Sequence, residues 1–164
     1  MASSHPYPDL PNPNTKNEVT MNGVDSFHHL HQMNHWALLV SAVMIWLIGA
    51  VWYSPLLFAK PWLAALGNIH NSADKGKGMA LGMIASLAGD ILVSFVLLHF
   101  IRWSGSADWQ HGVFIGFICW LGFFAATQLP QGIYEKRPSS LFLINAGYWL
   151  ISLMASGALL ASWK

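Results

Sequence analysis

The carboxyl group of Asp90 is the strongest candidate for chemistry in this sequence. It lies near the middle of the apolar stretch 79–101 and is the one formal charge within four such stretches. Ser86 and Ser94 lie four residues before and after it, on the same face of a helix. A carboxylate at bilayer depth is costly and usually faces other protein groups or water. We therefore interpret these three residues as a buried polar group. It is either a proton, cation or ligand site, or a protonated acid bonded to a neighbouring helix.

The positions that precede Asp90 at the same spacing carry small residues. Gly78 and Gly82 extend the row toward the N-terminus, and Gly112 and Gly116 form a similar row in the third apolar stretch. Small residues allow membrane helices to approach closely, and serines can form hydrogen bonds across the contact. The spacing predicts that the second and third stretches pack together along these rows.

Histidines form a second candidate group. We expect a helix that begins at Ser26 and continues into the first apolar stretch, with three of its histidines on one face. The expected topology brings two further histidines to the same membrane surface. Imidazole side chains can bind transition metals, and they can ligate haem or a chlorophyll-type pigment. The alternative is that these histidines simply tolerate the interface, because their spacing fits no standard zinc pattern. The candidate ligands are His28, His31, His35, His99 and His111.

The apolar stretches determine the expected architecture. A bilayer core of about 30 Å requires about 20 apolar residues in a helix. Hydrophobic residues make up 54% of the chain and charged residues 9%, which is far below the charged fraction of soluble domains. We predict an all-α integral membrane protein, an up-down four-helix bundle preceded by a polar, partly irregular tail at residues 1–35. The predicted spans are 36–58, 79–101, 112–129 and 141–163.

Charge indicates an orientation and excludes some partners. The net charge of +1 gives no indication of nucleic-acid binding. Basic residues concentrate on cytoplasmic loops, which predicts both termini outside the cytoplasm and the more basic loops inside. The basic residues of these two loops are Lys60, Lys75, Lys77, Lys136 and Arg137. The opposite side carries Arg102, Lys164 and the more distant Lys16.

Two motifs at the expected cytoplasmic end of the bundle carry a family resemblance. The first runs through residues 49–62 and includes Trp52, Tyr53, Ser54, Pro55, Lys60 and Trp62. The second runs through residues 134–148 and includes Glu135, Arg137, Asn145 and Tyr148. Over about residues 36–163 the sequence resembles a family of small bacterial four-span membrane proteins catalogued as domain of unknown function 1761. That resemblance implies a shared inner-face cluster and supplies no reaction, because the family has no established activity.

The function expected from these features is not enzymatic. The sequence has no Ser/His/Asp set, paired carboxylates or phosphate-binding glycine loop. Small-residue rows and many aromatic anchors favour an accessory or scaffold subunit of a larger membrane complex, which docks through these helix faces and the tail. One alternative is a small homo-oligomeric transporter or channel that uses Asp90. The spans show no Gly/Pro break of the kind that transporters use, which counts against it. A second alternative is metal, haem or pigment binding at the histidines. The expected partners are the bilayer of a bacterial inner membrane and other subunits or copies of this chain.

Overall fold

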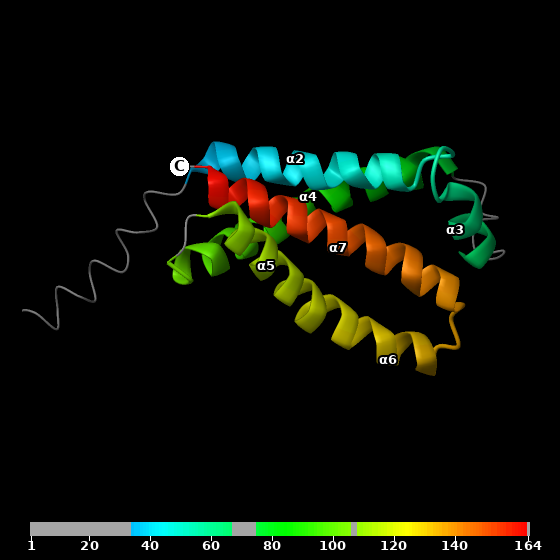
Figure 1. The fold of residues 1–164 in the computed structure, drawn as a ribbon. Helices are drawn as coiled ribbons and strands as arrows, with labels where there is room; N and C mark the ends of the chain where they lie inside the picture. The colour runs from blue at the N-terminus through cyan, green and yellow to red at the C-terminus, as the bar shows by residue number, and fades with distance from the viewer. Residues whose placement is uncertain (1–33, 67–74, 106–107, 164) are drawn as a thin grey trace, which may run out of the picture. The chain divides into compact units, whose positions relative to one another are not determined.

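The computed structural model describes residues 34–66, 75–105 and 108–163 of the chain. This part is built from helices alone (Figure 1). In chain order they are α2 (His35–Trp52), α3 (Ala59–Leu66), α4 (Lys75–Trp103), α5 (Trp109–Cys119), the π-helical segment η3 (Trp120–Ala125), α6 (Ala126–Tyr134) and α7 (Ser139–Ser162).

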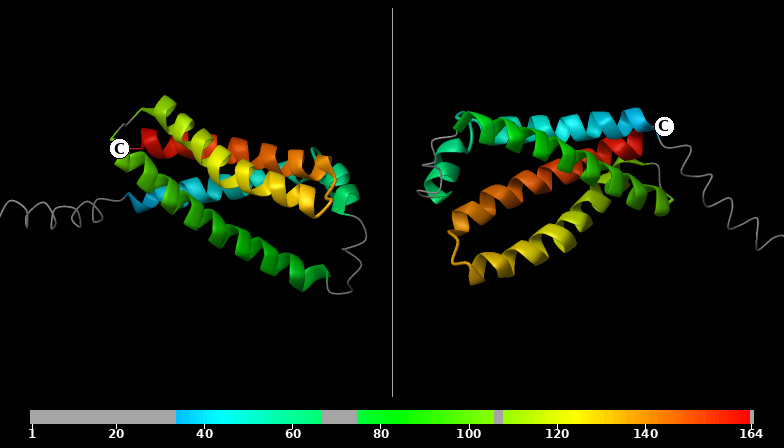
Figure 2. Two further views of the ribbon diagram at one scale, coloured as in Figure 1. Left: turned by 90° about the horizontal axis from the view of Figure 1, so that it is seen from below. Right: turned by 180° about the vertical axis from the view of Figure 1, so that it is seen from behind.

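Four of these segments are long and apolar enough to cross a membrane, which confirms the predicted all-α membrane fold. They are His35–Trp52, Ala80–Trp103, Trp109–Tyr134 and Ser139–Ser162. Successive spans run in opposite directions, so the ends of α2 and α6 lie toward one side of the bundle and those of α4 and α7 toward the other (Figures 1 and 2).

The ends of the first span differ from the prediction. The helix stops at Trp52 rather than at residue 58, and a turn leads into the short helix α3. At the other end, Asn34 has an extended backbone and its side chain accepts a hydrogen bond from the Ala37 amide at 3.3 Å. An N-cap of this kind begins a helix. The prediction of one continuous helix from Ser26 into this span is therefore wrong, because α2 begins directly after Asn34. Ser26 itself lies outside the described residues.

The third span is longer and less regular than the predicted range 112–129. Its helical path runs from Trp109 to Tyr134, includes the π segment and contains Pro130. Proline removes one helical hydrogen bond, and π segments are rare local irregularities of α-helices. The third span is therefore distorted, but its helical path is continuous and shows no unwound break. Within the π segment, the Trp120 indole donates to the Ala146 carbonyl of α7 at 2.9 Å.

Glycine positions decide which spans make backbone contact. Gly112 of α5 lies against Gly157 of α7, and Gly116 lies against the Leu153 backbone so closely that a Cβ would overlap it. By contrast, apart from the adjoining backbone of α4 itself, no described atom lies within 4 Å of where a Cβ would stand on Gly78 or Gly82. The prediction that these two rows pack together is therefore wrong. The third span packs on the fourth, because glycines on both helices let their backbones touch.

Three serines join α2, α4 and α7 in the core. The Ser41 hydroxyl lies 3.0 Å from the Ser94 hydroxyl and 2.5 Å from the Ser156 hydroxyl, and all three residues are fully buried. Ser94 is in the second half of α4. Toward its N-terminal end α4 diverges from α2 and α7, most clearly in the left view of Figure 2.

Candidate functional site

The divergence of α4 opens a cavity beside Asp90. The cavity has a volume of about 730 Å³ and is lined by residues of α2, α3, α4, α7 and the turn after α2. On the α4 side its wall carries the small residues Gly82, Ser86 and Gly89. Gly82 and Ser86, which the sequence pattern assigned to helix packing, thus leave room between the helices. The opposite walls are aromatic: Trp46, Tyr53, Trp62, Tyr148 and Trp149.

Asp90 is the acidic group of this cavity. Its side chain is 3% exposed, and within the described part of the chain its Oδ2 atom has no hydrogen-bond partner. A buried polar atom without a partner is costly, and buried polar groups in proteins are almost always bonded to protein or water. An unsatisfied carboxyl oxygen beside a cavity is therefore the strongest sign of a binding site in the described structure.

The three residues predicted as one polar group have different surroundings. Ser94 is buried at the contact with Ser41, one helical turn after Asp90. Ser86, one turn before it, is exposed, and its hydroxyl donates to the Gly82 carbonyl of its own helix at 2.7 Å. The prediction that Ser86 is buried at a helix contact is therefore wrong. Asp90 lies at the boundary, where α4 passes from a packed half to an open half.

The aromatic motif after α2 forms one end of the cavity. The Tyr53 hydroxyl donates to the Asn145 side-chain oxygen at 2.9 Å. The Tyr53 ring lies 5.3 Å from the Trp62 ring and 5.4 Å from the Tyr148 ring, in tilted arrangements. Next to it, the Trp52 indole donates to the Ile144 carbonyl at 3.0 Å. These contacts bring the two sequence motifs together, as the resemblance implied.

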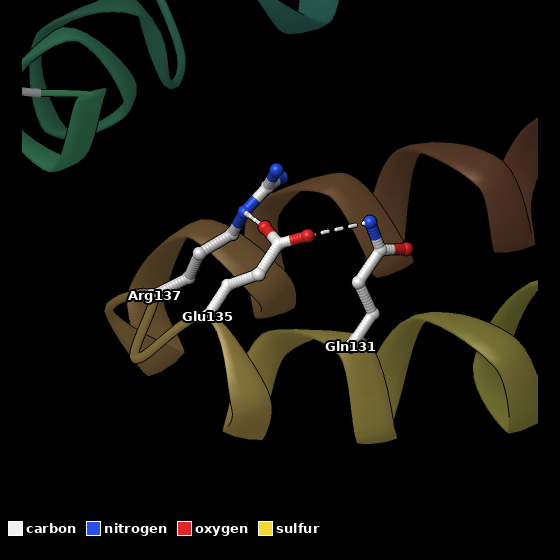
Figure 3. A network of polar contacts seen from close by, with 3 residues as sticks. All are labelled: Gln131, Glu135 and Arg137. Atoms are coloured by element: carbon white, nitrogen blue, oxygen red, sulfur yellow. Dashed lines mark hydrogen bonds and ion pairs between the residues drawn. The ribbon is translucent and has the colours of Figure 1, made fainter.

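The remaining motif residues lie away from the cavity. Ser54 donates to the Val51 carbonyl at 2.7 Å, and Pro55 and Lys60 are exposed. Glu135 forms an ion pair with Arg137 and accepts a hydrogen bond from the Gln131 amide at 2.8 Å (Figure 3). The Gln131 hydrogen bond, followed by the charge of Arg137, lowers the pKa of Glu135. This network is a surface feature of the turn between α6 and α7.

The described histidines do not assemble a metal centre. No group of three or more His, Cys, Asp or Glu side chains in the described residues could hold a metal ion. His35 is exposed, a His99 ring nitrogen lies 2.8 Å from the Phe95 carbonyl of its own helix, and His111 is half-buried. The other two predicted ligands, His28 and His31, lie outside the described residues.

A second cavity, of about 350 Å³, lies between α4, α7 and the third span. Its walls are apolar and aromatic, including Leu97, Phe100, Phe123 and Leu153. Ligand sites usually combine such walls with a few polar groups that orient the ligand. The lining of this cavity contains no carboxyl, hydroxyl or amide side chain, so the cavity beside Asp90 is the better candidate.

Sequence inspection missed Trp46 as a site residue. This tryptophan lies inside α2, well away from the helix ends where interfacial aromatic belts occur. It is half-buried and lines the Asp90 cavity. The position of this tryptophan in the middle of a span could have marked it as a candidate site residue. The sequence does not show, however, which helix its ring would face.

A comparison with protein families gives one match. The family model described as "Protein of unknown function (DUF1761)" matches residues 36–161. No curated protein matches the chain, and no solved structure matches it. Because the match covers most of the sequence, including all four candidate spans except their outermost residues, the chain belongs to this family.

Proposed function

We propose that this member of the DUF1761 family binds a small molecule inside the membrane, at the Asp90 cavity, as the cargo site of a small transporter. The observation that carries the proposal is Asp90: the residue lines a cavity of about 730 Å³, and its buried Oδ2 atom has no hydrogen-bond partner in the described residues. Acidic residues inside membrane spans commonly mark substrate or ion pathways.

The size and walls of the cavity support a small-molecule guest. Ligand pockets commonly measure about 300–1,000 Å³ and combine apolar walls with a few polar groups. Here the polar groups include the Asp90 carboxyl and the hydroxyls of Tyr53, Tyr148 and Ser86, and most of the remaining wall is aromatic or aliphatic. A guest that supplies a hydrogen bond or charge to Asp90 would remove the cost of its unsatisfied oxygen.

Irregular helix geometry supports transport rather than static binding. The third span contains a π segment and Pro130, and the first half of α4 lacks the close packing of its second half. Helix irregularities and loosely packed segments are where membrane proteins change conformation. No described group has the metal-ligand arrangement that would favour a metalloenzyme.

Cysteine accessibility tests the proposal directly. Ser86→Cys on a Cys119→Ala background should react with N-ethylmaleimide, because a thiol reacts as its thiolate and needs a hydrated setting. Ile84→Cys is the matched control, since Ile84 is 68% exposed on the same helix but does not line the cavity. It should react much more slowly in a bilayer. Equal, negligible rates at both positions would show a closed, dry cavity and contradict the proposal.

The second candidate function is an accessory or scaffold subunit of a larger membrane complex. It is favoured by Gly78 and Gly82, which leave room for a partner helix. Apart from the adjoining backbone of α4, no atom of the described chain lies within 4 Å of the position that a Cβ would take there. Gentle-detergent purification tests this candidate. Stoichiometric co-purification of another protein that is lost in Gly78→Leu, together with protection of Ser86→Cys in the complex, would favour the subunit. Purification of the chain alone would favour the cargo site.

We also propose a membrane and an orientation for the protein. We place the protein in a bacterial inner membrane with both termini outside the cytoplasm, since more basic residues flank the α3 and α6 ends of the bundle. Gly76→Cys on the Cys119→Ala background should react with an impermeant thiol reagent only after the cytoplasmic side is opened. Labelling of intact cells from outside would reverse the orientation.

A further inference from the structure

We infer that the Asp90 cavity selects an organic cation, a quaternary or protonated amine or a similar onium ion that carries apolar groups. This inference rests on the proposed cargo site and adds its chemical class. Three features of the described part of the cavity wall support it: one carboxyl group, no basic residue, and five aromatic side chains.

In the described wall of the cavity, Asp90 is the one side chain that can carry a charge near neutral pH. The lining residues from α2 and α3 carry no ionisable group, α7 contributes the phenol of Tyr148, and the turn after α2 contributes the phenol of Tyr53. Among the residues whose side chains the structure describes, no Lys, Arg or His lines the cavity. A carboxylate here lacks a counter-ion from the described chain, and a buried charge is tolerated only when it is paired. A cationic guest would supply that pair.

The aromatic residues suit the apolar part of such a guest. Five aromatic residues line the same cavity as Asp90: Trp46 from α2, Tyr53 from the turn after it, Trp62 from α3, and Tyr148 and Trp149 from α7. Aromatic faces attract cations within about 6 Å of the ring centre, and the attraction grows when the cation is desolvated. Hard inorganic cations such as Ca²⁺ and Mg²⁺ prefer a shell of about six or more oxygen ligands, whereas the described wall offers the Asp90 carboxyl and three hydroxyls among five aromatic rings. The combination therefore favours a bulky, weakly hydrated cation.

A proton competes with this cation for the same carboxylate. Binding of the cation should therefore weaken as the pH falls, because protonated Asp90 has no charge to pair with it. Among the described residues of the wall, the two tyrosines are the remaining ionisable groups, and an ordinary phenol stays neutral at acidic and neutral pH. The loss of affinity at low pH should thus depend on Asp90.

A pair of probes with opposite charge and the same shape tests the inference. Tetraphenylphosphonium and tetraphenylborate each carry four phenyl rings on one central atom. Calorimetry on the full chain in detergent, with empty micelles as the blank, should show saturable binding of tetraphenylphosphonium and none of tetraphenylborate. Asp90→Asn should weaken tetraphenylphosphonium binding at least tenfold and abolish its pH dependence, whereas Asp90→Glu should retain both.

A second comparison tests the aromatic wall. Trp46→Leu should weaken tetraphenylphosphonium binding several-fold. Phe114→Leu removes an aromatic ring at a 58% exposed position outside the cavity and should leave binding unchanged. Circular dichroism of each variant would show whether the helices are retained.

The outcomes separate this inference from the proposed function. Equal binding of both probes, or binding of tetraphenylphosphonium that is unaffected in a folded Asp90→Asn, would overturn the selection for cations and leave the cargo site standing. Absence of tetraphenylphosphonium binding with a reactive Ser86→Cys would also overturn the cation class alone. Absence of binding with an unreactive Ser86→Cys would overturn both.

Discussion

The Tyr53 hydroxyl donates a hydrogen bond to the Asn145 side-chain oxygen at 2.9 Å, across 92 residues of sequence. The bond joins the turn after α2 to the first half of α7. It also holds the Tyr53 ring beside the rings of Trp62 and Tyr148, at one end of the Asp90 cavity. Two motifs that are far apart in the chain thus form one wall of the candidate site.

We predict that Tyr53→Phe and Asn145→Ala are energetically coupled. Each change removes the same hydrogen bond, and side-chain hydrogen bonds between membrane helices contribute about 0.6 kcal/mol on average and up to about 1.7 kcal/mol. Unfolding of the single and double variants in a detergent titration should give a coupling energy in this range. Tyr134→Phe, at an 87% exposed tyrosine, is the control and should show no coupling. Strict additivity of Tyr53→Phe and Asn145→Ala would refute the bond.

We predict that Gly116→Leu breaks the contact between α5 and α7. A side chain at Gly116 would overlap the Leu153 backbone, which cannot move without displacing the helix. Overpacking of this severity should cost about 3 kcal/mol or more, or prevent folding. Gly122→Leu is the matched control in the same span, because it has no neighbour within 4 Å. Similar thermal stability for the two variants would contradict the packing.

We predict that Ser41→Ala and Ser152→Ala differ in effect although both serines are fully buried. Ser41 bonds to Ser94 and Ser156, so its loss leaves two hydroxyls short of a partner and should cost about 1–3 kcal/mol. The Ser152 hydroxyl has no well-formed hydrogen bond in the described residues and interacts with the Tyr148 side chain, so its removal should cost less than that of Ser41. Equal losses in chemical denaturation would show that the Ser41 cluster carries no special stability.

We predict that Glu135 titrates below its ordinary pKa, chiefly because of the Gln131 hydrogen bond and then because of Arg137. A lowered folded-state pKa means that the contribution of Glu135 to stability is present above its unfolded pKa. It is lost as the pH falls through the folded value. A carboxyl NMR titration should therefore show a midpoint below that of a glutamate in an unstructured peptide. Gln131→Leu should raise the midpoint, and a midpoint that stays unchanged would refute the role of the amide.

Much of the fold and one central site residue follow from the sequence alone. Length and hydropathy determine four membrane-crossing helices, since each span must satisfy its own backbone hydrogen bonds in lipid. Because Asp90 is the one charge in the apolar stretches, its residue type and position are enough to single it out. The two motifs also identify Tyr53, Asn145 and Tyr148 as residues that meet at one end of the bundle.

The tertiary structure decided how the small residues are used. Gly82 and Ser86 have the spacing of a packing row but line a cavity, whereas Gly112 and Gly116 pack closely on α7. Spacing shows which residues share a helix face, but it does not say what lies opposite that face. The shape of the opposite helix decides whether a small residue packs closely or lines a cavity. Gly157 lets the backbones of α5 and α7 touch. The contact between Ser41 and Ser94 holds the second half of α4 against α2, while the first half diverges. That divergence places the carboxyl of Asp90 beside an aromatic cavity.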